Sequence, residues 1–522
     1  MTRLGPTSAF TPPPIADVAK VPEVPAPTPK PGAGPEAPTS NVLIARIGVQ
    51  ADLTDEAKLP RGAERKQAVY DDLVATAKSS QVEALAKLGE LQAAGDVTAV
   101  ESLFLPNAIL VTTKAGRHQA VADALAGVAN VKDVAENKTW SVQGALDEAQ
   151  SGMTGAAAGA ALLAYAKGFV DGPAFLDAGT RPIGGEPGVE PAPTLVEPEQ
   201  PAAEWGVAKV NAPAAWAAGV DGSGVTVGVV DTGLDAAHPA IKAHYRGTQA
   251  DGSMVHDYNW FDPFTRSAAA FDDGDHGTHV AGSVAGGTDA RAIGVAPGAK
   301  VIAAKAINRS GYNTTAATLQ ALQFMLAPTK TDGSAPDPTK GADVINNSWG
   351  NANQADDTFI ETFAALKAAG IEVVSAAGND GPREGTVSPP GSYPGYLSVA
   401  ATTEGDKVAS FSSRGPSKFA TPEEMTPNVA APGAGVVSAV PGGRYQRMSG
   451  TSMASPHVAG AVALLLQAHP QATHDQIVAA LTRTAVDIDR PGPDNAAGFG
   501  RIDVTKALEH LGAAVAETKL EG

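Results

Sequence analysis

Ser452 is the residue in this sequence whose surroundings most clearly suggest chemistry. It stands in the segment 450–457 (Gly-Thr-Ser-Met-Ala-Ser-Pro-His), directly before the apolar run 458–466. That run predicts a buried helix, so Ser452 lies at a helix amino end, where backbone N–H groups have no helical acceptor. These N–H groups could receive the oxyanion that forms when a hydroxyl attacks a carbonyl. Serine is also a frequent N-cap, so a purely structural role for Ser452 stays open.

His276 and Asp231 are the residues that could activate such a nucleophile. His276 opens the segment 276–282 and precedes a small-residue helix predicted over 280–285. Asp231 directly follows the apolar run 225–230, which predicts a buried parallel strand. Sites in open α/β sheets gather at the carboxyl ends of strands, so Asp231 could accept the Nδ1–H of His276 and stabilise the charged ring.

Other residues near these motifs allow different interpretations. His457 lies nearer to Ser452 in the sequence, but five residues along a helix turn its side chain to another side. The tripeptide 231–233 (Asp-Thr-Gly) also occurs in aspartic proteases, which need two such carboxylates, and this chain has one. His276 and His279 could ligate a metal, yet the segment has no Glu and the chain has no Cys. We therefore expect no metal site there and a packed, structural His279.

Two further segments could bind the reacting carbonyl and the substrate chain. Asn379 follows the apolar strand predicted over 372–375, and its side-chain NH₂ could join the Ser452 backbone N–H as an oxyanion donor. Ser348, Trp349 and Gly350 follow another predicted strand, 344–347. An extended peptide could pair with that edge, where Gly350 lets its backbone approach.

The four segments occur in the order Asp231, His276, Asn379, Ser452, and the Asp–His–Ser order is that of subtilisin, not of chymotrypsin. The chain resembles the subtilisin-like serine protease family from about Trp205 to Leu508. Further matching segments are 294–298 (Gly-Val-Ala-Pro-Gly), 347–350 (Asn-Ser-Trp-Gly), 411–416 (Phe-Ser-Ser-Arg-Gly-Pro) and 431–433 (Ala-Pro-Gly).

This resemblance implies a serine endopeptidase that acts on proteins or peptides through an acyl-enzyme. Ser452 would be the nucleophile and His276 the general base and then the general acid. Asp231 would orient His276, and Asn379 would help to form the oxyanion hole. Two alternatives remain: a transpeptidase that uses the same acyl-enzyme, and an inactive scaffold of the same fold that only binds.

The chain divides into segments of different composition. Strands alternate with helical segments from Val225 onward, which predicts a three-layer α/β fold with a parallel sheet and helices on both faces. We assign the peptidase domain to 204–512, followed by a C-terminal tail at 513–522. A Pro/Ala-rich segment, expected to be disordered, covers 1–40, and a linker ending in a Pro/Glu-rich stretch covers 141–203.

Residues 41–140 predict a separate, small α+β domain. We expect strands at 41–49, 108–112 and 131–135, with helical segments at 64–94 and 118–128. This order is that of a ferredoxin-like sandwich. The domain resembles the inhibitory propeptide of subtilisin-like proteases, and an unrelated α+β domain is the alternative. As a propeptide, it would direct its last strand, 131–139, towards the cleft and cover the Ser348–Gly350 edge.

The overall composition limits the class of partner. The chain has 522 residues, a formal net charge of −18 and no cysteine. The negative charge argues against nucleic acid or an anionic membrane as a partner. No apolar run is long enough to span a membrane, and no apolar segment follows the first ten residues as in a secretory signal peptide. We expect a monomer that is cytoplasmic or exported by a non-classical route.

Two features of the family bear on cofactors and specificity. No cofactor is required, and many subtilisins place an aspartate calcium ligand where this chain has Ala240, so the usual strong calcium site is not expected. Asp272, Asp273 and Asp275 could bind a cation or form a solvated acidic loop. By resemblance, 391–394 would form part of the S1 wall, and its lack of acidic residues predicts an apolar or broad P1 preference.

Overall fold

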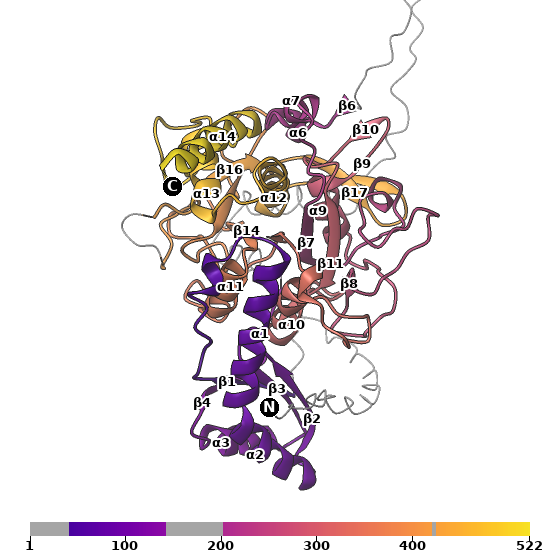
Figure 1. Cartoon of the computed structure of the whole chain (residues 1–522), viewed down its shortest axis with the longest axis vertical. Coiled ribbons are helices and arrows are strands. Elements are labelled where there is room, and N and C mark those ends of the chain that lie inside the picture. The colour runs from indigo at the N-terminus through magenta and orange to yellow at the C-terminus, as the bar shows by residue number, and fades with distance from the viewer. Residues whose placement is uncertain (1–40, 142–201, 420–423, 522) are drawn as a thin grey trace, which may run out of the picture.

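The computed structural model describes residues 41–141, 202–419 and 424–521 (Figure 1). Its larger body is built on a seven-stranded sheet with the order β16-β15-β14-β13-β7-β11-β8, in which every strand pairing is parallel. The strands are β7 (Thr226–Asp231), β8 (Trp260–Phe261), β11 (Lys300–Lys305), β13 (Val344–Asn347), β14 (Glu372–Ala376), β15 (Leu397–Thr402) and β16 (Val429–Pro432). Their nearly continuous apolar sequences are buried because helices cover both faces.

Helices lie on the two faces of this sheet (Figure 1), and neighbouring residues of a strand belong to different core clusters. Val374 packs in one core cluster with helices α9 (His276–Ala285) and α12 (Thr451–Ala468). Val373 packs in a second cluster with α10 (Thr315–Leu326) and α11 (Ile360–Ala368). This arrangement confirms the predicted three-layer α/β fold.

Shorter elements complete the body. They are β6 (Ala202–Ala203), α6 (Trp205–Lys209), α7 (Ala212–Ala217), α8 (Pro239–Lys242), β9 (Gly287–Thr288), β10 (Arg291–Ala292), β12 (Tyr312–Thr314), η2 (Pro338–Lys340), β17 (Val436–Val440), β18 (Arg444–Met448), α13 (His474–Arg483) and α14 (Val504–Glu521). Strands β17 and β18 form a hairpin, and α14 packs against both α12 and α13.

The N-terminal domain contains one antiparallel sheet with the order β2-β3-β1-β4, covered by helices. Its elements are β1 (Val42–Ile47), η1 (Glu56–Lys58), α1 (Ala63–Ser80), α2 (Val82–Ala93), β2 (Val97–Leu103), β3 (Ala108–Thr113), α3 (His118–Ala126) and β4 (Val131–Glu136). This chain order and sheet order are those of a ferredoxin-like unit.

The structure differs from the sequence prediction at two places in this domain. Strand β2 was not predicted, because it lies at the sheet edge and its exposed middle residues give no apolar alternation. The helical segment 64–94 is two helices that meet at Gln81. The Gln81 side chain is buried and donates to the Asn107 side chain (2.9 Å), which fixes the junction below the sheet.

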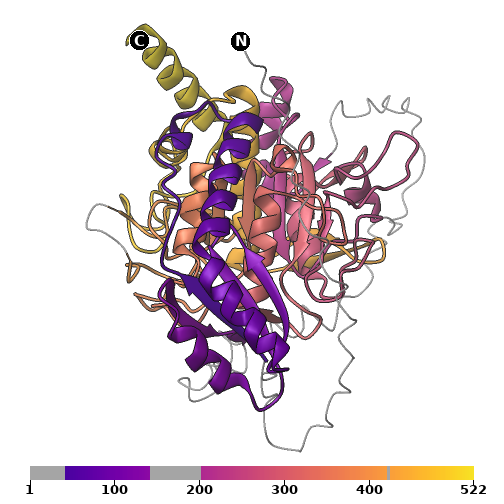
Figure 2. The same ribbon diagram turned by 60° about the horizontal axis from the view of Figure 1, so that its bottom comes forward.

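The N-terminal domain packs on the side of the body formed by α10 and α11 (Figure 2). Ile44 and Leu110 of its sheet share a core cluster with Leu319 and Phe363 of these helices. A short strand, β5 (Thr139–Ser141), then leaves the domain and pairs antiparallel with β12 of the body. The two domains are therefore joined by a continuous apolar core and by backbone pairing.

Candidate active site

Asp231 and His276 meet at the carboxyl end of the sheet. Asp231 is the last residue of β7 and fully buried, and His276 is the first residue of α9. The Nδ1 of His276 lies 2.7 Å from Oδ1 of Asp231, and the same oxygen accepts the backbone N–H of Thr232 at 2.7 Å. The carboxylate therefore favours the tautomer with hydrogen on Nδ1, which leaves Nε2 free to accept a proton.

The electrostatic surroundings of His276 act in opposite directions. Burial disfavours the charged imidazolium, whereas the charge and the hydrogen bond of Asp231, with the charge of Asp272, favour it. The acidic groups outweigh burial, so the pKa of His276 lies above its usual value. A ring of this kind can hold a proton that it has taken from a neighbouring hydroxyl.

Asp272 holds the loop that carries His276. Its Oδ1 accepts the hydroxyl of Thr232 (2.8 Å), and its Oδ2 accepts the backbone N–H of Thr278 (2.8 Å). Thr232 in turn accepts the N–H of Gly277 at 2.8 Å. The sequence named Asp272 only as a potential cation ligand and missed this contact, which arises from residues far apart in the chain.

Ser452 lies at the start of α12, as the apolar run predicted. Gly450 is the N-cap in an extended conformation, and Ser452 is 7% exposed. Its Oγ donates to the carbonyl oxygen of Ser348 (3.1 Å), while the Oγ of Ser348 donates to the Ser452 carbonyl (2.8 Å). Among the hydrogen bonds of the described residues, none joins Ser452 to His276. The structure thus joins Asp231 to His276 and Ser452 to the predicted substrate edge.

Asn379 is held beside Ser452 by the residue between Gly450 and Ser452. The Oδ1 of Asn379 accepts both the backbone N–H (2.9 Å) and the hydroxyl (3.0 Å) of Thr451. A Cβ placed on Gly450 would lie 3.6 Å from the Ser452 nitrogen and 3.7 Å from Nδ2 of Asn379. The glycine therefore leaves open a space that both of these N–H donors border.

A cleft of about 380 Å³ runs beside Ser452. Its lining residues are mostly small: Ser348, Trp349, Gly350, Asn351, Ala352, Ala376, Gly378, Asn379, Asp380, Ser388, Thr451 and Ser452. All three predicted substrate-edge residues line it. A Cβ on Gly350 would lie 2.8 Å from the hydroxyl of Ser388, so a larger residue would crowd the cleft. The segment 391–394, predicted as part of the S1 wall, does not line this cleft. Asp380 is the charged residue among those that do.

His279 and His457, the other two histidines of the motif segments, have structural partners. His279 is buried against the carbonyls of Val436 and Gln446, and burial together with the nearby His276 lowers its pKa to about 3. His457 donates its Nδ1–H to the Met453 carbonyl (2.8 Å), and burial lowers its pKa to about 4. Both rings therefore remain neutral and packed near pH 7.

Two of the three candidate cation residues, Asp272 and Asp273, are engaged by protein donors or cations. Asp272 makes the bonds described above, and Asp273, an exposed residue, pairs with the buried Lys305 (2.5 Å). Ala240 is buried in α8, and its N–H donates to His238 Nδ1 (3.0 Å). In the part of the chain that the structure describes, no group of three or more His, Cys, Asp or Glu side chains could hold a metal ion. No helix in that part is long and apolar enough to cross a membrane.

Comparison with known proteins agrees with this geometry. The model of the subtilase family matches residues 222–500, which is more than half of the chain. Bacillopeptidase F of Bacillus subtilis (strain 168) is 38% identical to this chain over 340 residues. Within the family, the resemblance to this protein also rests on the segments 204–205 (Glu-Trp), 245–247 (Tyr-Arg-Gly) and 259–262 (Asn-Trp-Phe-Asp). That match covers 61% of this chain and 23% of bacillopeptidase F, so the chain spans less than a quarter of this relative.

Shorter relatives are matched over more of their length. Subtilisin Savinase of Lederbergia lenta is 33% identical over 304 residues, covering 58% of this chain and 97% of the relative. Subtilisin E of Bacillus subtilis (strain 168) is 33% identical over 309 residues, covering 58% of this chain and 71% of the relative.

Proposed function

We propose that this chain, which belongs to the subtilase family, is a serine endopeptidase held inactive by its own N-terminal domain. The single observation that carries the enzymatic part is the Asp231–His276 hydrogen bond at the carboxyl end of β7, the strand next to β13, whose carboxyl end leads into the cleft that contains Ser452. A buried carboxylate, a histidine with a free Nε2 and a hydroxyl at a helix amino end are the groups that acyl transfer requires.

The reaction would use each group in turn. His276 Nε2 takes the proton of Ser452 while Oγ attacks the substrate carbonyl, and for this Oγ must leave the carbonyl oxygen of Ser348. The oxyanion is received by the Nδ2 of Asn379 and the Ser452 N–H, which border the space at Gly450. His276 then protonates the leaving amine, and water releases the acyl group by the reverse steps. Asp231 stabilises the charged ring throughout.

Buried hydrogen bonds support the position of the nucleophile. Asn346 of β13 donates to the Ser348 hydroxyl (2.8 Å) and accepts from Ser455 of α12 (2.5 Å). With the Ser348–Ser452 bonds, these contacts tie the first turn of α12 to the end of β13. The nucleophile and the substrate edge are therefore held by one network, which favours a fixed attack geometry.

The inhibitory part of the proposal is supported by β5. Its antiparallel pairing with β12 places Trp140 opposite Asn313, and the Trp140 ring packs edge-on against Phe359 with 6.0 Å between ring centroids. A peptide strand added to a free edge is the way in which a protease binds an extended substrate. The expected strand 131–139 is in fact two strands: β4 stays in its own sheet, and β5 pairs with β12 and not with Ser348–Gly350.

The test compares the wild-type chain with Ser452→Ala, each followed by gel electrophoresis and mass spectrometry. Ser452→Ala should stay full length and lose hydrolysis by about 10⁶-fold, the size of loss known for subtilisin, a member of this family. The wild-type chain should yield a fragment that begins between Ser141 and Pro201. Near-normal hydrolysis by folded Ser452→Ala would refute the assignment. Product masses from one peptide, with an added amine, separate hydrolysis from transpeptidation.

A further inference from the structure

Two ion pairs between the domains are buried. Arg61 of the N-terminal domain contacts Glu372 (2.5 Å), with side chains 9% and 2% exposed. Lys66 of α1 contacts Asp343 (2.7 Å), with side chains 4% and 26% exposed. Charges taken out of water in this way need good partners, and removal of one partner leaves the other at a large energetic disadvantage.

Backbone carbonyl oxygens complete the surroundings of these cations. Arg61 donates to the carbonyls of Gly370 and Ala472, and Lys66 donates to that of Gly341 (2.9 Å). Arg65, between them, donates to the carbonyls of Ala368 (2.6 Å) and Lys367 (3.2 Å). Lys367 and Ala368 are in the last turn of α11, where carbonyl groups lack helical donors and carry partial negative charge. The protease body thus presents a cradle of carboxylates and carbonyls to three cationic side chains.

This cradle lies far from the cleft along the same strands. Glu372 begins β14, and Asn379 follows the carboxyl end of that strand. Asp343 directly precedes β13, and Ser348 follows it. At about 3.3 Å per strand residue, roughly 17–23 Å separate the cradle from the cleft. The upper end of α1 in Figure 1 lies beside β14 and α11, whereas β5 pairs with a different element, β12.

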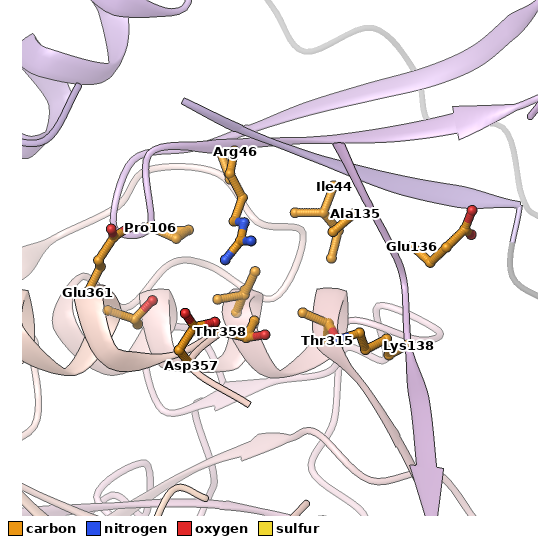
Figure 3. A pocket seen from close by; sticks show the side chains of 13 residues that line it. Ile44, Arg46, Pro106, Ala135, Glu136, Lys138, Thr315, Asp357, Thr358 and Glu361 are labelled. Carbon is orange, nitrogen blue, oxygen red and sulfur yellow. The ribbon is translucent and has the colours of Figure 1, made fainter. Parts of the chain in front are cut away.

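Outside the apolar core that the domains share, the other ion pairs of the interface are more exposed. Of the five ion pairs that the described residues form between the domains, the other three are Lys132–Glu361, Lys138–Asp356 and Arg266–Glu101, each with at least one side chain more than one-third exposed. A cavity of about 560 Å³ lies between part of the N-terminal sheet and α10 and α11, and Arg46 extends into it towards Asp357 (Figure 3). Exposed pairs contribute little to binding.

We infer that the protease body carries a second binding site, remote from the nucleophile, for a cationic helical segment, and that this site holds the N-terminal domain in place after the chain is cut. We define the anchor as Arg61, Arg65 and Lys66. We define the cradle as Glu372, Asp343 and the backbone carbonyls that the anchor side chains contact. The inference rests on the proposed function, because it concerns the domain proposed to inhibit. The inference assigns two functions to two parts of the chain: the anchor retains the domain, and β5 blocks the cleft.

The cradle keeps its form from contacts within the protease body. Glu372 also contacts the His474 ring (2.7 Å), and Asp343 Oδ2 accepts the Thr226 N–H (2.9 Å). Both carboxylates therefore stay oriented when the anchor leaves. The vacated cradle would select a partner that presents arginine and lysine side chains as this domain does, with Arg61 in the turn before α1 and Arg65 and Lys66 in its first turns.

The experiment uses the full chain with Ser452→Ala and a recognition sequence for a site-specific protease inserted between Arg181 and Pro182. The protein is immobilised through a carboxyl-terminal tag and cut, and release of the N-terminal fragment is followed over time. Arg61→Gln with Lys66→Gln should release the fragment about 100-fold faster or more, because the buried Glu372 and the partly buried Asp343 lose their cationic partners. The matched control, Lys78→Gln with Lys87→Gln, removes two exposed charges from the same domain and should stay within about twofold of the parent chain.

Circular dichroism of each uncut chain establishes that the domain is folded. If the anchor variant does not fold, Asp343→Asn with Glu372→Gln tests the same contacts from the protease side and should give the same faster release. Release of a folded variant at the control rate, from either side, would overturn the inference. Since every chain carries Ser452→Ala, the result does not depend on whether Ser452 is a nucleophile.

Discussion

The two ends of strands β13 and β14 differ in the kind of polar group that they present. At the carboxyl ends, Ser348 and Asn379 are neutral and border an open cleft. At the amino ends, Asp343 and Glu372 are charged and closed off by cations of another domain. Neutral polar groups can stay hydrated in the open cleft at little energetic cost until a substrate binds. A buried charge that loses its partner is strongly destabilising. One pair of strands can therefore carry a site for chemistry and a site for retention without interference.

The largest effect that should distinguish the two ends is on catalysis. Asn379→Ala should lower kcat by about 10²–10³-fold with little change in KM, because its NH₂ meets the oxyanion and not the ground-state carbonyl; the magnitude is that known for subtilisin itself. Steady-state kinetics with one peptide measures both constants. Release of the N-terminal fragment should be unchanged. A loss seen mainly in KM would assign Asn379 to substrate binding alone.

A smaller effect should separate blocking of the cleft from retention of the domain. Trp140→Ala removes a ring that is 9% exposed in the interface, and such aromatic contacts commonly dominate binding. In the uncut Ser452→Ala chain, a fluorescent peptide that the wild-type enzyme cleaves should bind about 10- to 30-fold more tightly. Trp140→Phe keeps an aromatic ring and should bind close to the parent value. Unchanged peptide binding in Trp140→Ala would mean that β5 does not block the cleft.

The smallest effect concerns the protonation of His276. Its raised pKa predicts that the imidazolium persists above pH 6.5. Because the base must be neutral, kcat/KM should fall as the pH drops through this pKa, so the acid limb lies above pH 6.5. NMR titration of the His276 ring in Ser452→Ala measures the value, and Asp231→Asn should move it down. A midpoint below pH 6.5 before that substitution would contradict the electrostatic account.

The cleft end could be predicted from the sequence because its residues occur in short local motifs. Asp231 follows a buried strand and Ser452 precedes a buried helix, so periodicity alone placed both at element ends, where the structure has them. The pairing of Asp231 with His276 was expected from the topology of a parallel sheet. The role of Asp272 in holding the His276 loop was missed, because its partners lie on separate segments.

The anchor end could not be predicted in the same way. Arg61, Arg65 and Lys66 stand around the start of a helix rich in charged residues, where such side chains usually face solvent. Nothing local marks them as buried, since their partners are about 300 residues away. Strand β2 was missed for a related reason, because its pairing with β3 and not its own pattern makes it a strand. Contacts between domains leave little trace in a local sequence window.

The account depends most on Ser452 being the activated nucleophile of this site. Reaction of the native chain with a fluorophosphonate, followed by digestion and mass spectrometry, tests this directly. One adduct should form, on the peptide containing Ser452, and it should be absent from unfolded protein and slower to form in Asp231→Asn. An adduct on a different residue, or none in a chain that hydrolyses peptides, would contradict the account.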